Sequence, residues 1–335
     1  MGNEKTTPLI EAIKKNDIEE VRRLIEAGAD VNEAENVKYV DSDYDDFDDF
    51  DDSVEDGKTP LMYAVENNSE EIVEFLIAHN ADVNTERRMD FHYGKQLPYE
   101  SYDCIIRTPL FIAVDNRNIE IVKLLLKNGA DASYQKGSDI LSDYHESILM
   151  AAAFYNSKEI AKLLIENGAD INARENISNR CVLNYTSVSD AKETAEFLIS
   201  CEGNDYDKED YEILLSDSVR AGSEKMVKFL IEFGIDFKSV KSFGRTLLME
   251  AAYNNRKNIA QFLIDNGADV NAADKDGMTA LMFAADNNAK ESVELLLEKG
   301  ADVNMTDKNN ETALMIAKKK SHTETINLLI RHGAK

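Results

Sequence analysis

The sequence predicts an all-α fold, a solenoid of stacked helix pairs with protruding hairpin or loop fingers. Three observations lead to this prediction. A short phrase, TPL or a variant of it, recurs along the chain; a glycine follows most copies at a similar distance; and small and large apolar side chains alternate between the two halves of each copy. The last copies start 32 or 33 residues apart, and a fixed period of this length indicates a repeat array.

The recurring phrase marks the start of each repeat. Its copies begin at Thr7, Thr59, Thr108, Ser147, Cys181, Ile213, Thr246, Thr279 and Thr312. Since each repeat in such an array packs on its neighbours, we expect one domain over residues 1–335, with repeats starting near positions 7, 59, 108, 147, 181, 213, 246, 279 and 312.

The first half of each repeat predicts a helix with a narrow apolar face. Threonine is a favourable N-cap, and proline fits the first helical position because its missing amide would be unpaired there. Three prolines follow such a threonine: Pro8, Pro60 and Pro109. In a later copy Leu281, Ala284 and Ala285 form a stripe of small residues, which lets neighbouring helices approach closely.

The second half of each repeat predicts a helix with a larger apolar face. Ile119, Val122 and Leu126 lie at helical spacing and carry longer side chains. A left-handed residue is expected where these helices end, and most copies have glycine there, while one has Asn80. The glycines are Gly28, Gly129, Gly168, Gly234, Gly267, Gly300 and Gly333.

The combined motif resembles the ankyrin repeat family: TPLxxAA, then EIVxLLL, then NGADVN, over Thr7 to Lys335. The resemblance implies helix-turn-helix repeats that bind other proteins through a concave groove. One departure recurs, because the histidine that the family carries after TPL is replaced. The replacements are Ile10, Met62, Phe111, Met150, Asn184, Ser216, Met249, Met282 and Met315. At this position we expect dispersion and sulfur packing instead of a hydrogen bond between neighbours.

Repeats five and six depart further from the pattern. Glu202 occupies the place of the left-handed glycine, and Ser216 with Asp217 makes the first helix of repeat six polar. Since the stability of such arrays depends on nearest neighbours, we expect this joint to open first.

Three enlarged connections interrupt the period near the N-terminus, at about residues 33–57, 85–107 and 134–146. All follow a second helix and precede the next phrase, where the family places a protruding finger. Insertions in repeat proteins map to one face, which is often the binding face.

The first enlarged connection contains the run DSDYDDFDDFDDSVED, from Asp41 to Asp56. Its alternation of acidic and aromatic residues favours a segment that docks on a basic, apolar partner. Two alternatives remain: a calcium loop with Asp41, Asp43 and Asp45 as first ligands, which would make the protein cation-responsive, or a solvated acidic loop. The docking interpretation selects Tyr44, Asp45, Phe47, Asp48, Phe50 and Asp51 as partner-binding residues.

The second candidate surface is the groove, which the resemblance assigns to the seventh and eighth residues after the start of each repeat. The groove residues selected as partner-binding are Phe154, Tyr155, Tyr253, Asn254, Asp286 and Asn287. Exposed aromatic side chains make good binding residues because they offer a large rigid area at low entropic cost. For Phe154 and Tyr155 the alternative is that they cover an irregular fourth repeat.

Composition limits the classes of partner. The chain has 64 acidic and 38 basic residues, a formal net charge of −26, which opposes binding to nucleic acid or an anionic membrane and favours a protein with a basic surface. Three cysteines without metal-type spacing indicate a reducing compartment. We expect a monomeric cytoplasmic protein, or a secreted effector if a leader has been removed. Scattered histidines and the lack of a glycine-rich phosphate loop predict that the chain is not an enzyme and uses no cofactor or metal. The ankyrin resemblance then implies an adaptor, inhibitor or effector that binds another protein.

Overall fold

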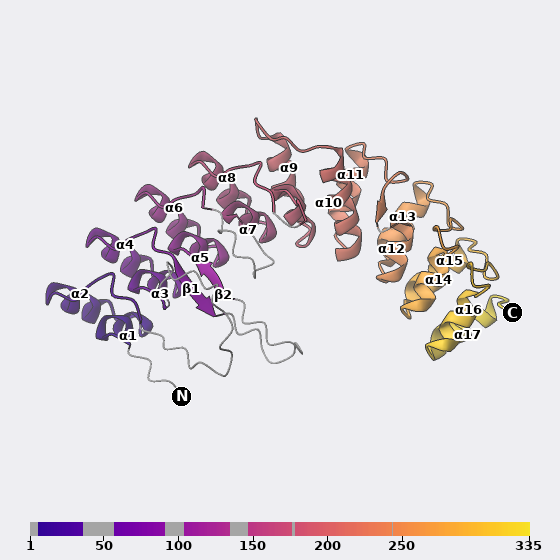
Figure 1. The fold of residues 1–335 in the computed structure, drawn as a ribbon, viewed down its shortest axis with the longest axis horizontal. Helices are drawn as coiled ribbons and strands as arrows, with labels where there is room; N and C mark the ends of the chain where they lie inside the picture. Colours follow the sequence, from indigo (N-terminus) through magenta and orange to yellow (C-terminus); the bar gives the residue numbers. More distant parts are fainter. Residues whose placement is uncertain (1–5, 36–56, 91–103, 135–146, 176–177, 243) are drawn as a thin grey trace, which may run out of the picture. The chain divides into compact units, whose positions relative to one another are not determined.

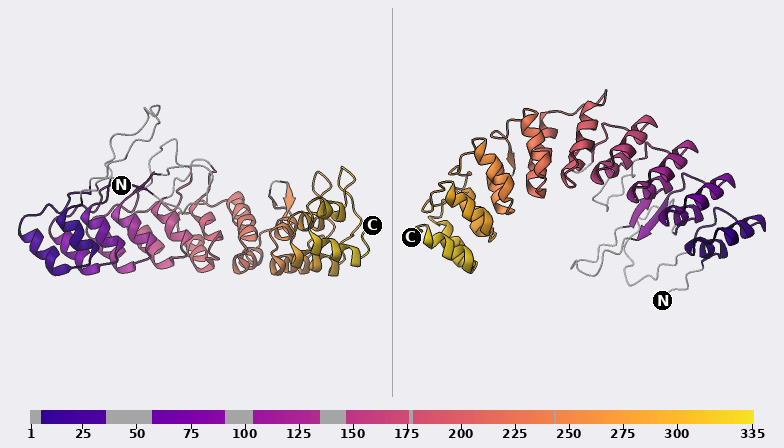
Figure 2. Two further views of the ribbon diagram at one scale, coloured as in Figure 1. Left: turned by 90° about the horizontal axis from the view of Figure 1, so that it is seen from below. Right: turned by 180° about the vertical axis from the view of Figure 1, so that it is seen from behind.

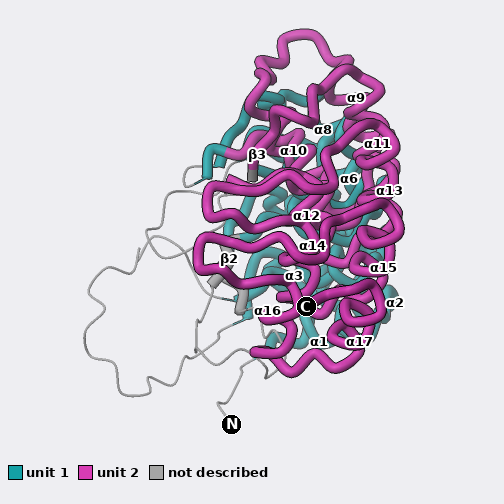
Figure 3. The backbone as a smooth tube through the Cα atoms, turned by 90° about the vertical axis from the view of Figure 1, so that its right-hand side faces the viewer, with its two compact units in different colours: residues 1–179 teal, residues 180–335 magenta. Residues whose placement is uncertain are grey.

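The computed structural model describes residues 6–35, 57–90, 104–134, 147–175, 178–242 and 244–335 (Figure 1). The chain divides into two compact units, Met1–Asn179 and Arg180–Lys335 (Figure 3). Each unit consists of short antiparallel helix pairs, so the predicted all-α helix-pair fold is confirmed. In the described ranges, strand is limited to two short hairpins and a few isolated bridge residues. The single domain over residues 1–335 stays a prediction.

The first unit contains four helix pairs and the β1–β2 hairpin. The pairs are α1 (Pro8–Lys14) with α2 (Ile18–Glu26), α3 (Pro60–Glu66) with α4 (Glu70–Ala78), α5 (Pro109–Asp115) with α6 (Ile119–Lys127), and α7 (Ile148–Phe154) with α8 (Lys158–Glu166). Figure 1 shows the first helices in one row and the second helices in another. Strands β1 (Arg87–Asp90) and β2 (Cys104–Arg107) pair antiparallel with Arg87 opposite Arg107, so the second enlarged connection starts and ends as a hairpin.

The second unit begins with a 3₁₀ helix, η1 (Val182–Ser187), in place of an α-helix. Its other helices are α9 (Lys192–Ser200), α10 (Lys208–Ala221), α11 (Glu224–Glu232), α12 (Leu247–Tyr253), α13 (Lys257–Asp265), α14 (Ala280–Asp286), α15 (Lys290–Glu298), α16 (Ala313–Lys319) and α17 (Thr323–Arg331). Strands β3 (Lys241–Ser242) and β4 (Arg245–Thr246) form a small hairpin. Figure 2 shows this hairpin and the connections after α13 and α15 projecting from the same edge of the helix layers.

Predicted capping residues start and end the helices. The side chain at the start accepts a hydrogen bond from the backbone N–H three residues later, as at Thr59, whose Oγ1 is 3.3 Å from the Met62 nitrogen. The same bond is made at Thr7, Thr108, Ser147, Thr246, Thr279 and Thr312. At the ends of the second helices every predicted glycine has φ between +85° and +107°, and Asn80 has φ +66°. The predicted left-handed turns are confirmed.

The position that lacks the family histidine is part of the core. Met62, Met150, Met249 and Met282 are at most 1% exposed, because the next helix pair covers them. Met315 is 45% exposed in the last described repeat, where α16 has a neighbour on one side only. Repeats five and six differ in chemistry, because this position is polar in both. Ser216 is 6% exposed, and Asn184 is fully buried with its Nδ2 donating to the Asp210 carbonyl oxygen at 2.8 Å.

Asparagines in the turns join neighbouring repeats by hydrogen bonds that the sequence did not reveal. The Asn84 Nδ2 donates to the Gly129 carbonyl oxygen at 2.9 Å, and its Oδ1 accepts from the Asp131 N–H at 2.8 Å. The same two bonds, from the asparagine side chain to the turn of the following repeat, are made by Asn32, Asn271 and Asn304. Dispersion in the core and this polar ladder together set the spacing of the repeats.

Besides the 3₁₀ helix η1, repeats five and six depart from the repeat pattern at three positions. The left-handed residue after α9 is Gly203, with φ +84°, so the turn comes one residue later than Glu202, where the repeat pattern places it. Helix α10 starts at Lys208, five residues before the predicted repeat start at Ile213, because Asp207 and Asp210 form a capping box. The Ser216 hydroxyl is buried without a hydrogen-bond partner, which weakens this helix.

Replacing Asn271 with alanine should lower the free energy of unfolding by about 1 kcal/mol, because two hydrogen bonds to the next turn are lost and each contributes about 0.5–1.5 kcal/mol. Urea titration would measure the change. Asn327→Ala, on the exposed side of α17, is the control and should be nearly neutral. Equal losses in both variants would contradict the role of the ladder.

Amide hydrogen exchange should be faster in η1 and α10 than in α12 and α14 of the same unit. A 3₁₀ helix has poorer hydrogen-bond geometry, and α10 buries Ser216 and Ser218 where α12 and α14 bury methionine and alanine. Exchange measured by mass spectrometry would test this expectation. Slowest exchange within residues 181–236 would show that it is wrong.

Candidate functional site

The first enlarged connection begins and ends in a well-defined cluster of side chains. The Glu35 N–H donates to the Lys58 carbonyl oxygen at 3.0 Å, so the two ends of the connection are held together. The Glu35 carboxylate is 5% exposed and accepts hydrogen bonds from Thr6 Oγ1 and Lys14 Nζ, both at 2.9 Å, and from the Tyr63 hydroxyl. We name these residues, Thr6, Lys14, Glu35 and Tyr63, the Glu35 cluster.

Two lysines surround the aromatic ring of this cluster. The Lys14 ammonium lies 4.6 Å and the Lys58 ammonium 5.3 Å from the centre of the Tyr63 ring. Lys58 also forms a 2.6 Å ion pair with Glu66, the last residue of α3. The ends of the acidic connection therefore lie against the C-terminal ends of α1 and α3, which are groove positions.

Hydrogen bonding keeps Glu35 charged. Burial by itself raises the pKa of this carboxyl, but the hydrogen bonds from Tyr63, Lys14 and Thr6 and the charge of Lys14 outweigh burial, so the pKa lies below its usual value of 4.5. The cluster is thus an ion pair with additional hydrogen bonds at neutral pH.

The position of Glu35 recurs in the repeats, five residues after the aspartate of each GAD-type turn. In repeats seven and eight it is Asp274 and Asp307, whose carboxylates accept backbone N–H bonds of 2.8–2.9 Å that close a tight loop. In repeat one the longer glutamate side chain instead reaches Lys14 and Tyr63. An acid at this position in four repeats, Glu35, Glu175, Asp274 and Asp307, was the sequence signal for the cluster, and it was missed among the many carboxylates.

The second enlarged connection ends on a similar arrangement. Arg107, at the end of β2, is 9% exposed; its guanidinium lies 3.9 Å from the Phe111 ring centre and its Nη2 is 3.6 Å from Asp115 Oδ2. Burial raises the pKa of Asp115, and the charge of Arg107 opposes that rise. Both arrangements place a cation over an aromatic ring of a first helix, next to the acid at its C-terminal end.

The predicted groove residues of the first unit form an aromatic pair. Phe154 is 38% exposed, and its ring centre lies 5.2 Å from that of Tyr155 in an edge-to-face arrangement. The Arg117 guanidinium lies 5.7 Å from the Tyr155 ring centre. An exposed aromatic surface with a cation beside it can receive an apolar or acidic side chain of a partner.

The predicted groove residues of the second unit form another aromatic surface. Tyr253 and the buried Phe283 pack edge to face at 6.5 Å, and the Arg245 guanidinium lies 4.2 Å from the Phe283 ring centre and 5.7 Å from that of Tyr253. Asp286 forms a 2.7 Å ion pair with Lys320 of the next repeat. Asp286 is therefore already paired within the groove.

Two of the asparagines predicted to bind a partner, Asn254 and Asn287, form hydrogen bonds within the fold. The Asn287 Nδ2 donates to the Tyr253 carbonyl oxygen of the preceding repeat at 2.8 Å, as Asn67 and Asn116 do to Ile13 and Val65. The Asn254 Nδ2 donates to the Glu250 carbonyl oxygen at 2.9 Å and caps its own helix. Both side chains thus have a structural role, whatever else they contact.

The remaining selected residues, Tyr44, Asp45, Phe47, Asp48, Phe50 and Asp51, lie outside the described residues. The same holds for the calcium interpretation of Asp41 to Asp56, and for most of the third enlarged connection, residues 135–146.

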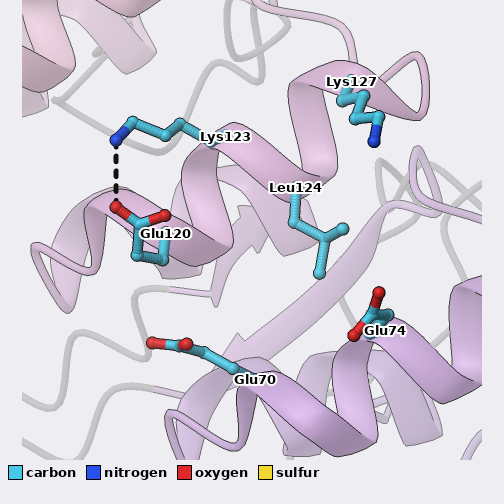
Figure 4. Close-up of a pocket in the computed structure, with 6 residues that line it drawn as sticks. All are labelled: Glu70, Glu74, Glu120, Lys123, Leu124 and Lys127. Atoms are coloured by element: carbon cyan, nitrogen blue, oxygen red, sulfur yellow. Dashed lines mark hydrogen bonds and ion pairs between the residues drawn. The ribbon is translucent and has the colours of Figure 1, made fainter.

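A small hollow of about 270 Å³ lies between α4 and α6 of the first unit (Figure 4). Three glutamates, two lysines and Leu124 line it, and one of the lysines, Lys123, is already bonded to Glu120 at 2.9 Å. Within the described ranges, no group of three or more His, Cys, Asp and Glu side chains is arranged to hold a metal ion. In the same residues, no helix is long and apolar enough to span a membrane.

Comparison with known families agrees with the repeat geometry. A family model described as ankyrin repeats (3 copies) matches residues 1–87, 95–175, 133–210, 183–274 and 215–307, and one described as ankyrin repeat matches residues 309–335. A search of curated proteins gives no match.

Glu35→Gln should lower the free energy of unfolding at neutral pH by about 2 kcal/mol, because a buried charged acceptor of three hydrogen bonds is lost. Since the pKa of Glu35 is lowered by folding, its stabilisation is present above pH 4.5 and is lost as the pH falls through the folded-state pKa. Urea unfolding of parent and variant should therefore converge in acid. Glu33→Gln, at an exposed neighbour, is the control and should leave the free energy of unfolding at neutral pH nearly unchanged.

Proposed function

Because the chain belongs to the ankyrin repeat family, whose repeats are protein–protein interaction modules, we propose that it acts by binding another protein as an adaptor, inhibitor or effector. The proposed binding surface joins the groove positions of the first helices with the enlarged N-terminal connections. The chain performs no chemistry of its own in this proposal, in keeping with a family of typically non-enzymatic modules.

One observation carries the proposal. The Glu35 cluster holds the start and the end of the acidic connection together, and it does so at the C-terminal ends of α1 and α3. A segment held at both ends beside a groove can contact the same partner as the groove, and this shared contact increases affinity through effective concentration.

Charge indicates the kind of partner. Sixteen residues from Asp41 to Asp56 carry ten carboxylates, and the whole chain has a net charge of −26. Such a surface accelerates encounter with a basic protein and disfavours nucleic acid and anionic membranes. We propose a monomer that works in the cytoplasm, or as a secreted effector, on a protein with a basic surface.

The experiment is affinity capture on the full-length chain, with quantitative mass spectrometry of the retained proteins. Three variants are compared with the parent: the aspartates of 41–56 changed to asparagine; Tyr44, Phe47 and Phe50 changed to alanine; and Phe154 with Tyr253 changed to alanine. We expect basic proteins that are retained by the parent and reduced in all three variants. Equal retention by every variant would show that neither surface binds the partner.

With a captured partner in hand, kinetics should separate the two roles of the acidic connection. Aspartate-to-asparagine changes should lower the association rate and its salt dependence, since charge acts on encounter. Changing the three aromatics should chiefly increase the dissociation rate, by roughly tenfold for a loss of about 1.4 kcal/mol. Surface plasmon resonance at several salt concentrations would measure both effects, and unchanged rates in both variants would mean that the segment is a solvated loop.

A further inference from the structure

One exposed aromatic residue departs from a pattern that five other repeats share. In those repeats the residue after the second helix is asparagine or histidine, and its side chain lies against the carbonyl oxygen four residues earlier. The Nδ2 atoms of Asn128, Asn167 and Asn266 donate to that oxygen at 2.7–2.8 Å, and the Nδ1 atoms of His79 and His332 lie 2.8 and 2.9 Å from it. After α11 the residue is Phe233, which is 50% exposed.

Phenylalanine at this position has two costs. It cannot supply the side-chain hydrogen bond that asparagine or histidine makes at the end of the second helix in five other repeats. It also leaves half of a large apolar side chain in water, although burying apolar surface stabilises the folded protein by about 25 cal/mol per Å². Since asparagine serves at three equivalent positions, folding alone does not explain the choice of Phe233.

The irregular helix α10 completes an aromatic surface around Phe233. Its additional N-terminal turn carries Tyr211, whose ring centre lies 5.6 Å from that of Phe233 with a 31° angle between the planes. Phe229, on α11, lies 5.8 Å from Phe233 at 38°. Both neighbours are half-buried, so the three rings form one supported surface with Phe233 outermost. We name Tyr211, Phe229 and Phe233 the Phe233 surface.

This surface lies apart from the groove. Tyr211 is at the N-terminal end of the first helix of repeat six and Phe233 follows the C-terminal end of the second helix. The groove residues of the same unit, such as Tyr253 and Asp286, are at the C-terminal ends of first helices. In an antiparallel helix pair these are opposite ends.

The surroundings of the Phe233 surface are strongly acidic. Residues 202–212 and 232–236 contain eight carboxylates and one lysine, Lys208, which is already paired with Glu212 at 2.9 Å. Glu209, Glu232 and Asp236 are exposed, and the C-terminal end of α11 adds the negative end of a helix dipole. One ring of the surface already has a cation near it, since the Lys192 ammonium lies 5.5 Å from the Phe229 ring centre.

We propose that the Phe233 surface is a second docking site, which binds a peptide segment of a partner protein that presents arginine beside an aliphatic side chain. The planar, weakly hydrated guanidinium stacks on the exposed Phe233 ring and pairs with Glu232 or Asp236, as an ammonium does less well. The aliphatic side chain covers the remaining apolar area of Tyr211 and Phe233. The Phe233 surface contains no groove residue. The test of this proposal can therefore fail without contradicting the proposed function, and the reverse also holds.

The test uses a random 12-residue peptide library displayed on phage and selected on the immobilised full-length chain. Enriched peptides are synthesised, labelled with fluorescein and titrated by fluorescence anisotropy against the parent and its variants. We expect sequences with arginine next to leucine, isoleucine, valine or methionine. Their affinity should fall at least tenfold when the arginine of the peptide is replaced by glutamine, and less when it is replaced by lysine.

The decisive variant is Phe233→Asn, which removes the ring and restores the side chain that repeats three, four and seven use. It should weaken binding at least tenfold without lowering the melting temperature, so lost binding cannot be ascribed to unfolding. Tyr211→Ala should weaken binding by a smaller factor. Phe233→Lys introduces the residue type that repeat eight has at the equivalent position, Lys299, and so provides a second folded variant that removes the ring and adds a repelling charge.

Two controls address position and surface. Asn266→Phe places the same ring at the equivalent position of repeat seven, where no additional turn supplies a second aromatic, and should not create a second site. Tyr253→Ala alters the groove and should leave peptide binding unchanged. The proposal is overturned if enriched peptides lack arginine, if no peptide is enriched, or if the enriched peptides bind the Phe233→Asn variant as well as the parent.

Discussion

Helices of seven and nine residues are too short to be stable alone in water, so every repeat of this chain depends on the repeat beside it. Met62 and Met282 are buried only because the following helix pair covers them, and Met315, which has no such neighbour, remains half exposed. The turn asparagines add hydrogen bonds across the same junctions. Apolar contact provides most of the stabilisation, while the asparagine ladder fixes how far apart and in which register successive repeats lie.

This dependence determines where binding residues can be. One face of each helix packs on neighbouring helices, and several groove side chains have partners too: Asn287 bonds to the previous repeat and Asp286 pairs with Lys320. Two aromatic residues at helix ends, Phe154 and Phe233, remain exposed. One position of the repeat has two different roles. In repeat eight it is Asp307, whose carboxylate closes a tight loop; in repeat one it is Glu35, whose longer side chain bonds to Lys14 and Tyr63 and so holds the ends of an enlarged connection at the groove.

Repeats five and six combine most of the departures from the repeat pattern. The 3₁₀ helix η1 and the unpaired hydroxyl of Ser216 lower local stability, and the left-handed turn after α9 is displaced by one residue to Gly203. In the same place, the additional turn of α10 brings Tyr211 against an exposed Phe233. Natural proteins tend to depart from local sequence–structure preferences at functional sites. Because the irregular helices and the exposed aromatic surface occur together in repeats five and six, we propose a binding role for this region.

The sequence alone determined the helix pairs, their caps and their left-handed turns, because each follows from local chemistry: Thr59 caps, Pro60 starts, and Gly129 turns the chain. It also identified repeats five and six as irregular and selected Phe154 and Tyr253 as groove aromatics. Only the tertiary structure decided which polar side chains are shared between repeats, that Asn254 and Asn287 are structural, that Glu35 holds an enlarged connection closed, and that Tyr211 meets Phe233. Most of these contacts join residues of different helices or of different repeats, so their geometry depends on how the helices pack, which the sequence pattern of one helix does not contain.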